Sequence, residues 1–252
     1  MPDKTFLNWP FFEERHKALA EKLDTWAAKN LAHVDHADVD AACRALVSKL
    51  GNDGWLEHSA PGAEAEKIDV RTLALIRETL ARHSGLADFA FAMQGLGAGP
   101  ISLFGTSAQR ETWLPKTRSG KAIAAFALSE AASGSDVANI TTSARRDGDG
   151  DGYVIDGEKC WISNGAIADI YIVFARTGEA PGARGLSAFI VEGSNPGLAV
   201  VERIEVIAPH PLARLSLKNC RVPTDALIGK SGDGFKIAMA TLDVFRTTVG
   251  AA

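Results

Sequence analysis

Cysteine is scarce in this sequence, and long apolar runs are absent. Its three cysteines, Cys43, Cys160 and Cys220, are far apart and lack CxxC spacing, which argues against a disulfide framework or a zinc site. We expect reduced, mostly buried thiols. No apolar run approaches the roughly 18 residues of a membrane span, and the N-terminal stretch has neither the apolar core of a signal peptide nor the composition of a transit peptide. We therefore expect a cytoplasmic protein without a membrane span.

Basic charge is not in excess either. The formal net charge is −4, and the only basic cluster is the pair Arg145-Arg146. A domain that binds a nucleic-acid duplex usually carries a basic stripe, so we expect no nucleic-acid partner. Small anionic substrates stay open, because local placement of Arg and Lys matters more than net charge.

Common catalytic and metal signatures are missing. The chain has no GxxxxGK[ST], HExxH or GxSxG motif, and its six histidines are scattered. The stretch GLGAGP (95–100) resembles a dinucleotide-binding fingerprint, but its sixth position is proline and no βαβ pattern surrounds it. Residues 147–152 with Glu158 match the EF-hand expression, yet strand-like flanks replace the required helices. We interpret this stretch as a hairpin loop and expect no metal.

Two textures divide the chain, the first of them helical. Up to residue 120, apolar residues recur at helical spacing. We expect helices over 18–28, 37–50, 70–83, 84–96 and 108–116, with a Gly- and Pro-interrupted stretch over 97–105. The clearest helix, 70–83, places Leu73, Ile76 and Leu80 on one face.

From Lys121 onward, short apolar runs of strand length alternate with turn residues. We expect strands over 123–128, 153–155, 170–175, 186–192, 198–206 and 214–220. Their short, regular spacing indicates an antiparallel β-barrel or sandwich. Residues 234–252 return to a helical pattern and stop inside it, which would expose an apolar face. We expect either a fragment or a natural half-subunit completed by a partner chain.

The predicted fold is therefore α+β and multidomain. An N-terminal all-α helical domain (1–120) precedes a middle β domain (121–230), and residues 231–252 begin a C-terminal helical bundle. No internal repeat or low-complexity segment is present.

Two segments carry the polar groups that suggest a binding site. FALSEAASGSD (126–136) is a strand end followed by a loop of small residues, whose backbone N–H groups and hydroxyls suit a polar ring edge or a phosphate. KCWISNG (159–165) places a large aromatic beside hydroxyl and amide donors. From the residues alone, a buried core tryptophan and an ordinary Ser-Gly turn explain these segments equally well.

Taken together, the order and spacing of these segments resemble those of acyl-CoA dehydrogenases. GLSAFIVE (185–192), NCRVP (219–223) and GDGF (232–235) agree, and the resemblance covers essentially the whole chain. It implies a helical domain, a middle β domain that binds FAD, and a C-terminal four-helix domain of which only the start is present. It also implies an acyl-CoA substrate, an electron-transfer flavoprotein as electron acceptor, and a homo-oligomer, either tetramer or dimer.

The resemblance assigns roles residue by residue. The positions expected to contact the flavin are Phe126, Leu128, Ser129, Trp161, Ile162 and Ser163. The positions expected to contact the substrate are Ser135, Asp243 and Arg246. The implied reaction removes an α-proton from the thioester and transfers a β-hydride to flavin N5.

No catalytic base is expected in this chain. In some family members the base lies one residue before the arginine that matches Arg246, but here that residue is Phe245, which cannot accept a proton. The base would then lie beyond Ala252 or on a partner chain.

Other departures leave the acyl chain length and branching open: Ser129 replaces a commoner Thr, Ala131-Ala132 replaces Pro-Gly, and residues 208–214 replace a Gly-rich stretch. We interpret His210 as structural. An oxygen-using relative, such as an acyl-CoA oxidase or a flavin monooxygenase, and a non-catalytic partner subunit remain as alternatives.

Overall fold

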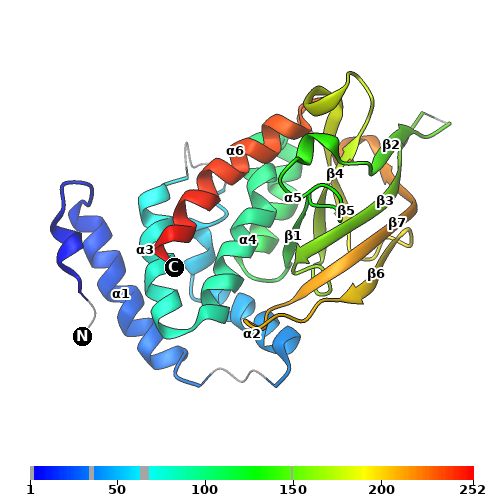
Figure 1. Ribbon diagram of the computed structural model, residues 1–252. Coiled ribbons are helices and arrows are strands. Elements are labelled where there is room, and N and C mark those ends of the chain that lie inside the picture. The colour runs from blue at the N-terminus through cyan, green and yellow to red at the C-terminus, as the bar shows by residue number, and fades with distance from the viewer. Residues whose placement is uncertain (1–2, 34–36, 63–67, 149) are drawn as a thin grey trace.

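The computed structural model describes residues 3–33, 37–62, 68–148 and 150–252. A group of helices packs beside a twisted β-sheet, and the last helix runs back across the helical group (Figure 1). The α-helices are α1 (Glu14–Asn30), α2 (Val39–Asn52), α3 (Val70–His83), α4 (Gly85–Phe104), α5 (Ser107–Arg118) and α6 (Gly234–Arg246). The 3₁₀ turns are η1 (Thr5–Asn8), η2 (Trp55–His58), η3 (Val137–Asn139), η4 (Gly182–Gly185), η5 (Thr224–Ala226) and η6 (Thr247–Ala251).

Side-chain caps fix where several helices begin. The Asp38 carboxylate accepts a hydrogen bond from the N–H of Ala41, so α2 begins at Val39 rather than at the predicted residue 37. Ser84 caps α4 in the same way, and Thr106 with Gln109 forms a capping box at α5. The predicted helix 70–83 is confirmed, and its apolar face of Leu73, Ile76 and Leu80 is fully buried.

The strands are β1 (Ala124–Ala127), β2 (Ser143–Arg146), β3 (Gly152–Ser163), β4 (Ile170–Arg176), β5 (Leu186–Glu192), β6 (Leu198–Arg203), β7 (Leu212–Pro223) and β8 (Leu227–Ile228). They form one sheet in the order β6-β7-β3-β2-β4-β5-β8, with β1 paired to β4 off this path. Most neighbours are antiparallel, which confirms the α+β prediction, but β1 runs parallel to β4. That parallel pairing carries the end of β1 toward the helices.

The prediction of a break after Leu96 is wrong, because α4 continues through Gly97, Gly99 and Pro100 to Phe104. The glycines serve close packing rather than chain reversal. A Cβ atom at Gly97 would lie 2.7 Å from the carbonyl carbon of Ala124 in β1, and one at Gly99 would lie 2.8 Å from Cγ2 of Thr241 in α6. The Gly-rich stretch therefore lets α4 touch β1 and α6 directly.

The Asp/Gly run at residues 147–151 joins antiparallel strands β2 and β3, which confirms the hairpin prediction. The carboxylate of Asp147 forms an ion pair with Arg221 of β7. All three cysteines are free thiols, with Cys43 and Cys220 buried and Cys160 half-buried, as predicted. Burial raises the pKa of Cys43 to about 12, so this thiol stays protonated.

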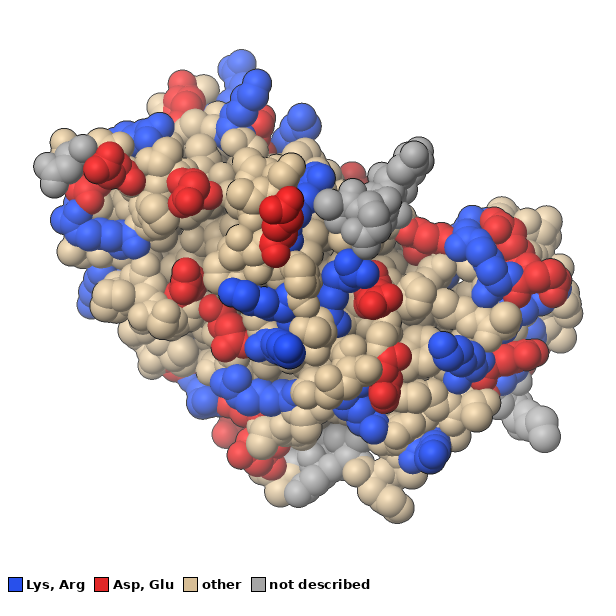
Figure 2. Space-filling view, turned by 180° about the vertical axis from the view of Figure 1, so that it is seen from behind, with Lys and Arg blue, Asp and Glu red and all other residues tan. Residues whose placement is uncertain are grey.

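No helix among the described residues is long and apolar enough to cross a membrane. On the molecular face seen in Figure 2, basic and acidic side chains are interspersed, and neither sign forms a continuous stripe.

Candidate functional site

A cleft of about 580 Å³ lies where α4, the end of β1, the end of β3 and α6 meet. Eight of the nine residues predicted to contact flavin or substrate line it: Phe126, Leu128, Ser129, Ser135, Trp161, Ile162, Ser163 and Arg246. The ninth, Asp243, is exposed on α6 and does not line the cleft. Segments separated by more than one hundred residues thus converge on a single cavity.

The loop that follows β1 forms one wall of the cleft. Leu128 is buried, Ser129 is half-buried, and Ser135 lies exposed farther along the same loop. Among the described residues, no hydrogen-bond partner occupies the hydroxyl of Ser129 or that of Ser163 across the cleft. Both hydroxyls therefore remain able to donate to a bound molecule.

A β-bulge in β3 aims Trp161 out of the sheet. The pairing of β3 with β7 shifts register between Lys159 and Ile162, so two residues of β3 oppose one of β7. Trp161 has φ 60°, in the left-handed region that bulky residues rarely adopt. Its side chain is 57% exposed beside the cleft, although large aromatics are usually buried. A held, half-exposed indole is suited to stacking on a planar ring.

Asn164 anchors the end of this bulged strand. It also has positive φ, which asparagine tolerates better than tryptophan does. Its buried amide donates from Nδ2 to the carbonyl oxygen of Ala124 in β1 at 3.1 Å, and its N–H donates to the carbonyl oxygen of Pro211. Sequence inspection did not single out Asn164, and only its place in the segment KCWISNG points to it.

A buried ion pair lies behind the cleft and was also missed. Lys159 Nζ donates to Glu130 Oε1 at 2.9 Å and to the carbonyl oxygen of Leu128 at 3.0 Å. Burial lowers the pKa of Lys159, and the Glu130 carboxylate offsets part of that shift. Burial also acts to raise the pKa of Glu130, but the Lys159 charge and hydrogen bonds from Thr141 and Thr142 outweigh it and hold this pKa below its usual range.

Helix α6 supplies the remaining wall through Phe235, Met239, Leu242 and Arg246. Arg246 is exposed at the rim, and no carboxylate pairs with it in the described part of the chain. Its neighbour Phe245 is 5% exposed, faces α4 and does not line the cleft. His210 lies outside the cleft too and packs its ring against Phe89 at a centroid distance of 4.5 Å.

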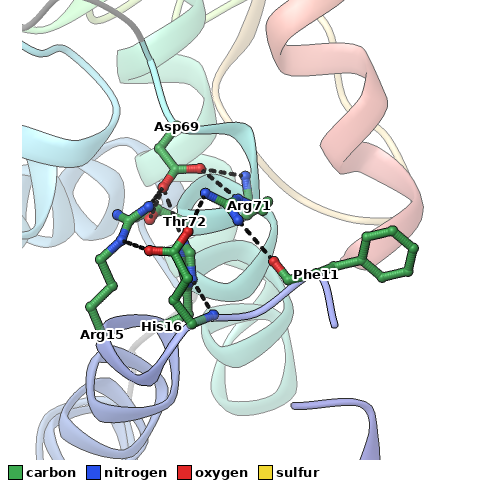
Figure 3. Close-up of polar contacts among 7 residues, drawn as sticks. Phe11, Arg15, His16, Asp69, Arg71 and Thr72 are labelled. Carbon is green, nitrogen blue, oxygen red and sulfur yellow. Dashed lines mark hydrogen bonds and ion pairs between the residues drawn. The ribbon is translucent and has the colours of Figure 1, made fainter. Parts of the chain in front are cut away.

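A second polar cluster joins the N-terminal ends of α1 and α3 (Figure 3). The Asp69 carboxylate caps α3 and pairs with Arg15 at 2.8 Å. His16 is buried, and because its Nδ1 accepts from the N–H of Glu13, its Nε2 carries the proton that is donated to Asp69. Burial acts to raise the pKa of Asp69, but hydrogen bonds from His16, Arg15 and Thr72 hold it well below its usual range.

Comparison with known proteins agrees with this geometry. Residues 13–121 match the family model of the acyl-CoA dehydrogenase N-terminal domain, and residues 125–220 match that of the middle domain. The chain is 33% identical over 244 residues to a mitochondrial isobutyryl-CoA dehydrogenase of Dictyostelium discoideum, covering 96% of this chain and 55% of the relative. It is 36% identical over 243 residues to the human mitochondrial short-chain specific acyl-CoA dehydrogenase, covering 92% of this chain and 58% of the relative.

The fold is similar to that of a solved acyl-CoA dehydrogenase complexed with FAD from Bacillus anthracis. The TM-score is 0.84 at 32% identity, and the match covers 95% of this chain and 41% of that chain. The chain belongs to the acyl-CoA dehydrogenase family. It spans little more than half the length of the two curated relatives.

Proposed function

We propose that this chain forms the flavin-facing part of an FAD-dependent acyl-CoA dehydrogenase that desaturates an acyl-CoA thioester between its α and β carbons. The observation that carries the proposal is the convergence of eight predicted contact residues, from three separate segments, on one cleft. The proposed domain boundaries are 1–120, 121–230 and 231–252.

The donors and surfaces of the cleft fit a flavin. The hydroxyls of Ser129 and Ser163 are available to donate to the polar edge of an isoalloxazine ring, and Trp161 offers a flat apolar surface beside them. FAD, when bound, would accept the hydride. Phe126, Leu128 and Ile162 would exclude water from the ring, which strengthens the nearby hydrogen bonds.

The substrate would lie toward α6. Ser135 and the unpaired guanidinium of Arg246 are polar groups that line the cleft there, and Met239 and Leu242 supply apolar surface for an acyl chain. Asp136 is the one carboxylate among the lining residues, and it accepts a hydrogen bond from Asn139 at 2.6 Å. We propose that the catalytic base lies outside these residues, because Phe245 cannot accept a proton.

Family membership also motivates three broader proposals. The electron acceptor would be an electron-transfer flavoprotein, the full-length protein would be a homo-oligomer, and its location would be cytoplasmic. These proposals rest on the resemblance and on the absence of a leader-like segment in the sequence.

The first experiment is the visible spectrum of the purified chain after incubation with FAD and removal of free flavin. A retained, structured flavin band is expected, and Trp161→Ala should weaken FAD binding by at least tenfold, since base–aromatic stacking of this kind contributes about 1–3 kcal/mol. Trp9→Ala is the matched control, because Trp9 is also 57% exposed but lies in the N-terminal segment, away from the cleft lining. Equal loss of binding in both variants would contradict the assignment of this cleft.

A second measurement separates dehydrogenase from oxygen-using chemistry. In the full-length enzyme with product bound, air should reoxidise the reduced flavin slowly. Rapid reoxidation would favour an acyl-CoA oxidase or a flavin monooxygenase.

A further inference from the structure

The buried Lys159–Glu130 ion pair connects the two sequence segments that form opposite walls of the cleft. Lys159 belongs to β3, just before the bulge at Trp161, and its side chain is fully buried. Its ammonium reaches across to the β1 loop, where it donates to the carboxylate of Glu130 and to the main chain of Leu128. One side chain thus holds two points of the opposite wall.

Glu130 in turn gathers the far end of the same loop. Its Oε2 accepts from the N–H and hydroxyl of Thr141 at 2.7 and 2.8 Å, and its Oε1 accepts from the N–H of Thr142 at 2.9 Å. The loop between these points, which includes the cleft-lining residues 134–138, is therefore closed at its base by one carboxylate.

The bulge is registered against this loop by a main-chain bond. The N–H of Cys160 donates to the carbonyl oxygen of Ser129 at 2.9 Å. Lys159 and Cys160 are consecutive, so their bonds to Leu128 and Ser129 fix both the separation and the register of the two walls. Ser129 and Trp161, which would flank the flavin, each lie one residue from this link.

Stability alone is a weak reason to bury such a pair. Removing two charges from water costs several kcal/mol each, and apolar residues of similar volume often stabilise a fold equally well. A buried ion pair does, however, impose a specific geometry, because its donors and acceptors must meet at fixed positions.

We propose that Lys159 and Glu130 are positioning residues, whose ion pair sets the spacing of the Ser129 and Trp161 walls so that the cleft accepts a planar cofactor. The identification of that cofactor as FAD rests on the proposed function. The pair itself touches neither the cofactor nor the substrate in this arrangement, since neither residue lines the cleft.

The test measures amide hydrogen exchange in the chain without flavin, together with FAD binding. The double variant Lys159→Met/Glu130→Gln removes both charges and keeps the side-chain volumes. We expect exchange at the N–H groups of Thr141, Thr142 and Cys160 to accelerate at least tenfold relative to the β-sheet core, and FAD binding to weaken at least tenfold. Lys159→Arg, which keeps the charge, should recover part of both.

A matched control is the other buried ion pair, Arg77–Asp88, which joins α3 and α4 at 2.7 Å and does not line the cleft. Arg77→Met/Asp88→Asn should lower the thermal midpoint without selective exchange at the three amides. The proposal is overturned if the Lys159/Glu130 double variant folds with those amides still protected, or if their exchange merely follows global unfolding.

Two further outcomes are assigned in advance. If the double variant does not fold, Glu130→Gln alone replaces it, because this substitution keeps the side-chain shape, and selective exchange at the same amides is again required. If the unsubstituted chain binds no FAD, the proposed function loses its cofactor, whereas amide exchange still decides whether the pair positions the walls.

Discussion

The ring of Phe245 in α6 lies directly against Gly95 in α4. A Cβ atom added at Gly95 would sit 2.5 Å from Cε1 of Phe245, and one added at Gly99 would sit 3.1 Å from Cε2 of the same ring. The position that holds a base in some relatives is therefore occupied here by a packing residue. The stretch GLGAGP, which matched no nucleotide-binding motif, forms the surface that receives this ring.

We predict that Gly95→Ala destabilises the chain by about 1–3 kcal/mol, because the new methyl group overpacks the contact with Phe245. The measurement is the free energy of unfolding from urea denaturation. Gly85→Ala on the same helix is the control, since a Cβ atom there meets nothing within 4 Å. Its stability should be unchanged or slightly higher. Equal stability in the two variants would show that the Gly95 contact is loose.

Phe245→Ala should cost about 3–5 kcal/mol, the usual range for removing a large buried aromatic ring. The residue is 5% exposed and joins α6 to the core formed by α3 and α4. Val249→Ala, at a position 58% exposed, is the control and should change stability by less than about 0.5 kcal/mol. A loss below about 1 kcal/mol for Phe245→Ala would indicate that α6 contributes little to folding of this chain.

Local sequence signals predicted much of this fold. Residues 70–83 form the expected helix because their apolar spacing and the Asp69 cap agree. The two cleft segments were recognised by the order and spacing of FALSEAASGSD and KCWISNG, and they meet as expected.

Tertiary contacts decided what sequence inspection missed. Helix α4 passes through Gly97 and Pro100 because β1 and α6 require a close approach, which no local pattern encodes. Lys159 was not expected to be buried, since lysine is rarely buried without a partner and its partner lies 29 residues away. The bulge that exposes Trp161 depends on the register with β7, a strand about fifty residues later.

Trp161→Gly is predicted to separate stability from binding. Glycine adopts positive φ without steric cost, so the strain at φ 60° would be relieved and the free energy of unfolding should stay the same or rise by about 1 kcal/mol. Flavin binding should nevertheless fall at least tenfold, because the indole surface is lost. Urea denaturation and flavin titration of the same sample measure both effects. A variant that is less stable yet binds FAD normally would contradict both halves of the prediction.

Acid should weaken the α1–α3 junction through Asp69. Its folded pKa lies below the unfolded value of about 3.9, so its contribution is fully present above roughly pH 4 and is lost as the pH falls toward the folded pKa. Asp69→Asn should therefore cost about 1–2 kcal/mol at pH 7, because the charge-assisted bonds to Arg15 and His16 are weakened, and much less at pH 2.5. Urea denaturation at both pH values tests this, with the exposed Glu111→Gln as control. An Asp69→Asn penalty that stays the same at both pH values would mean that the amide fails as a helix cap and that the charge of Asp69 contributes little.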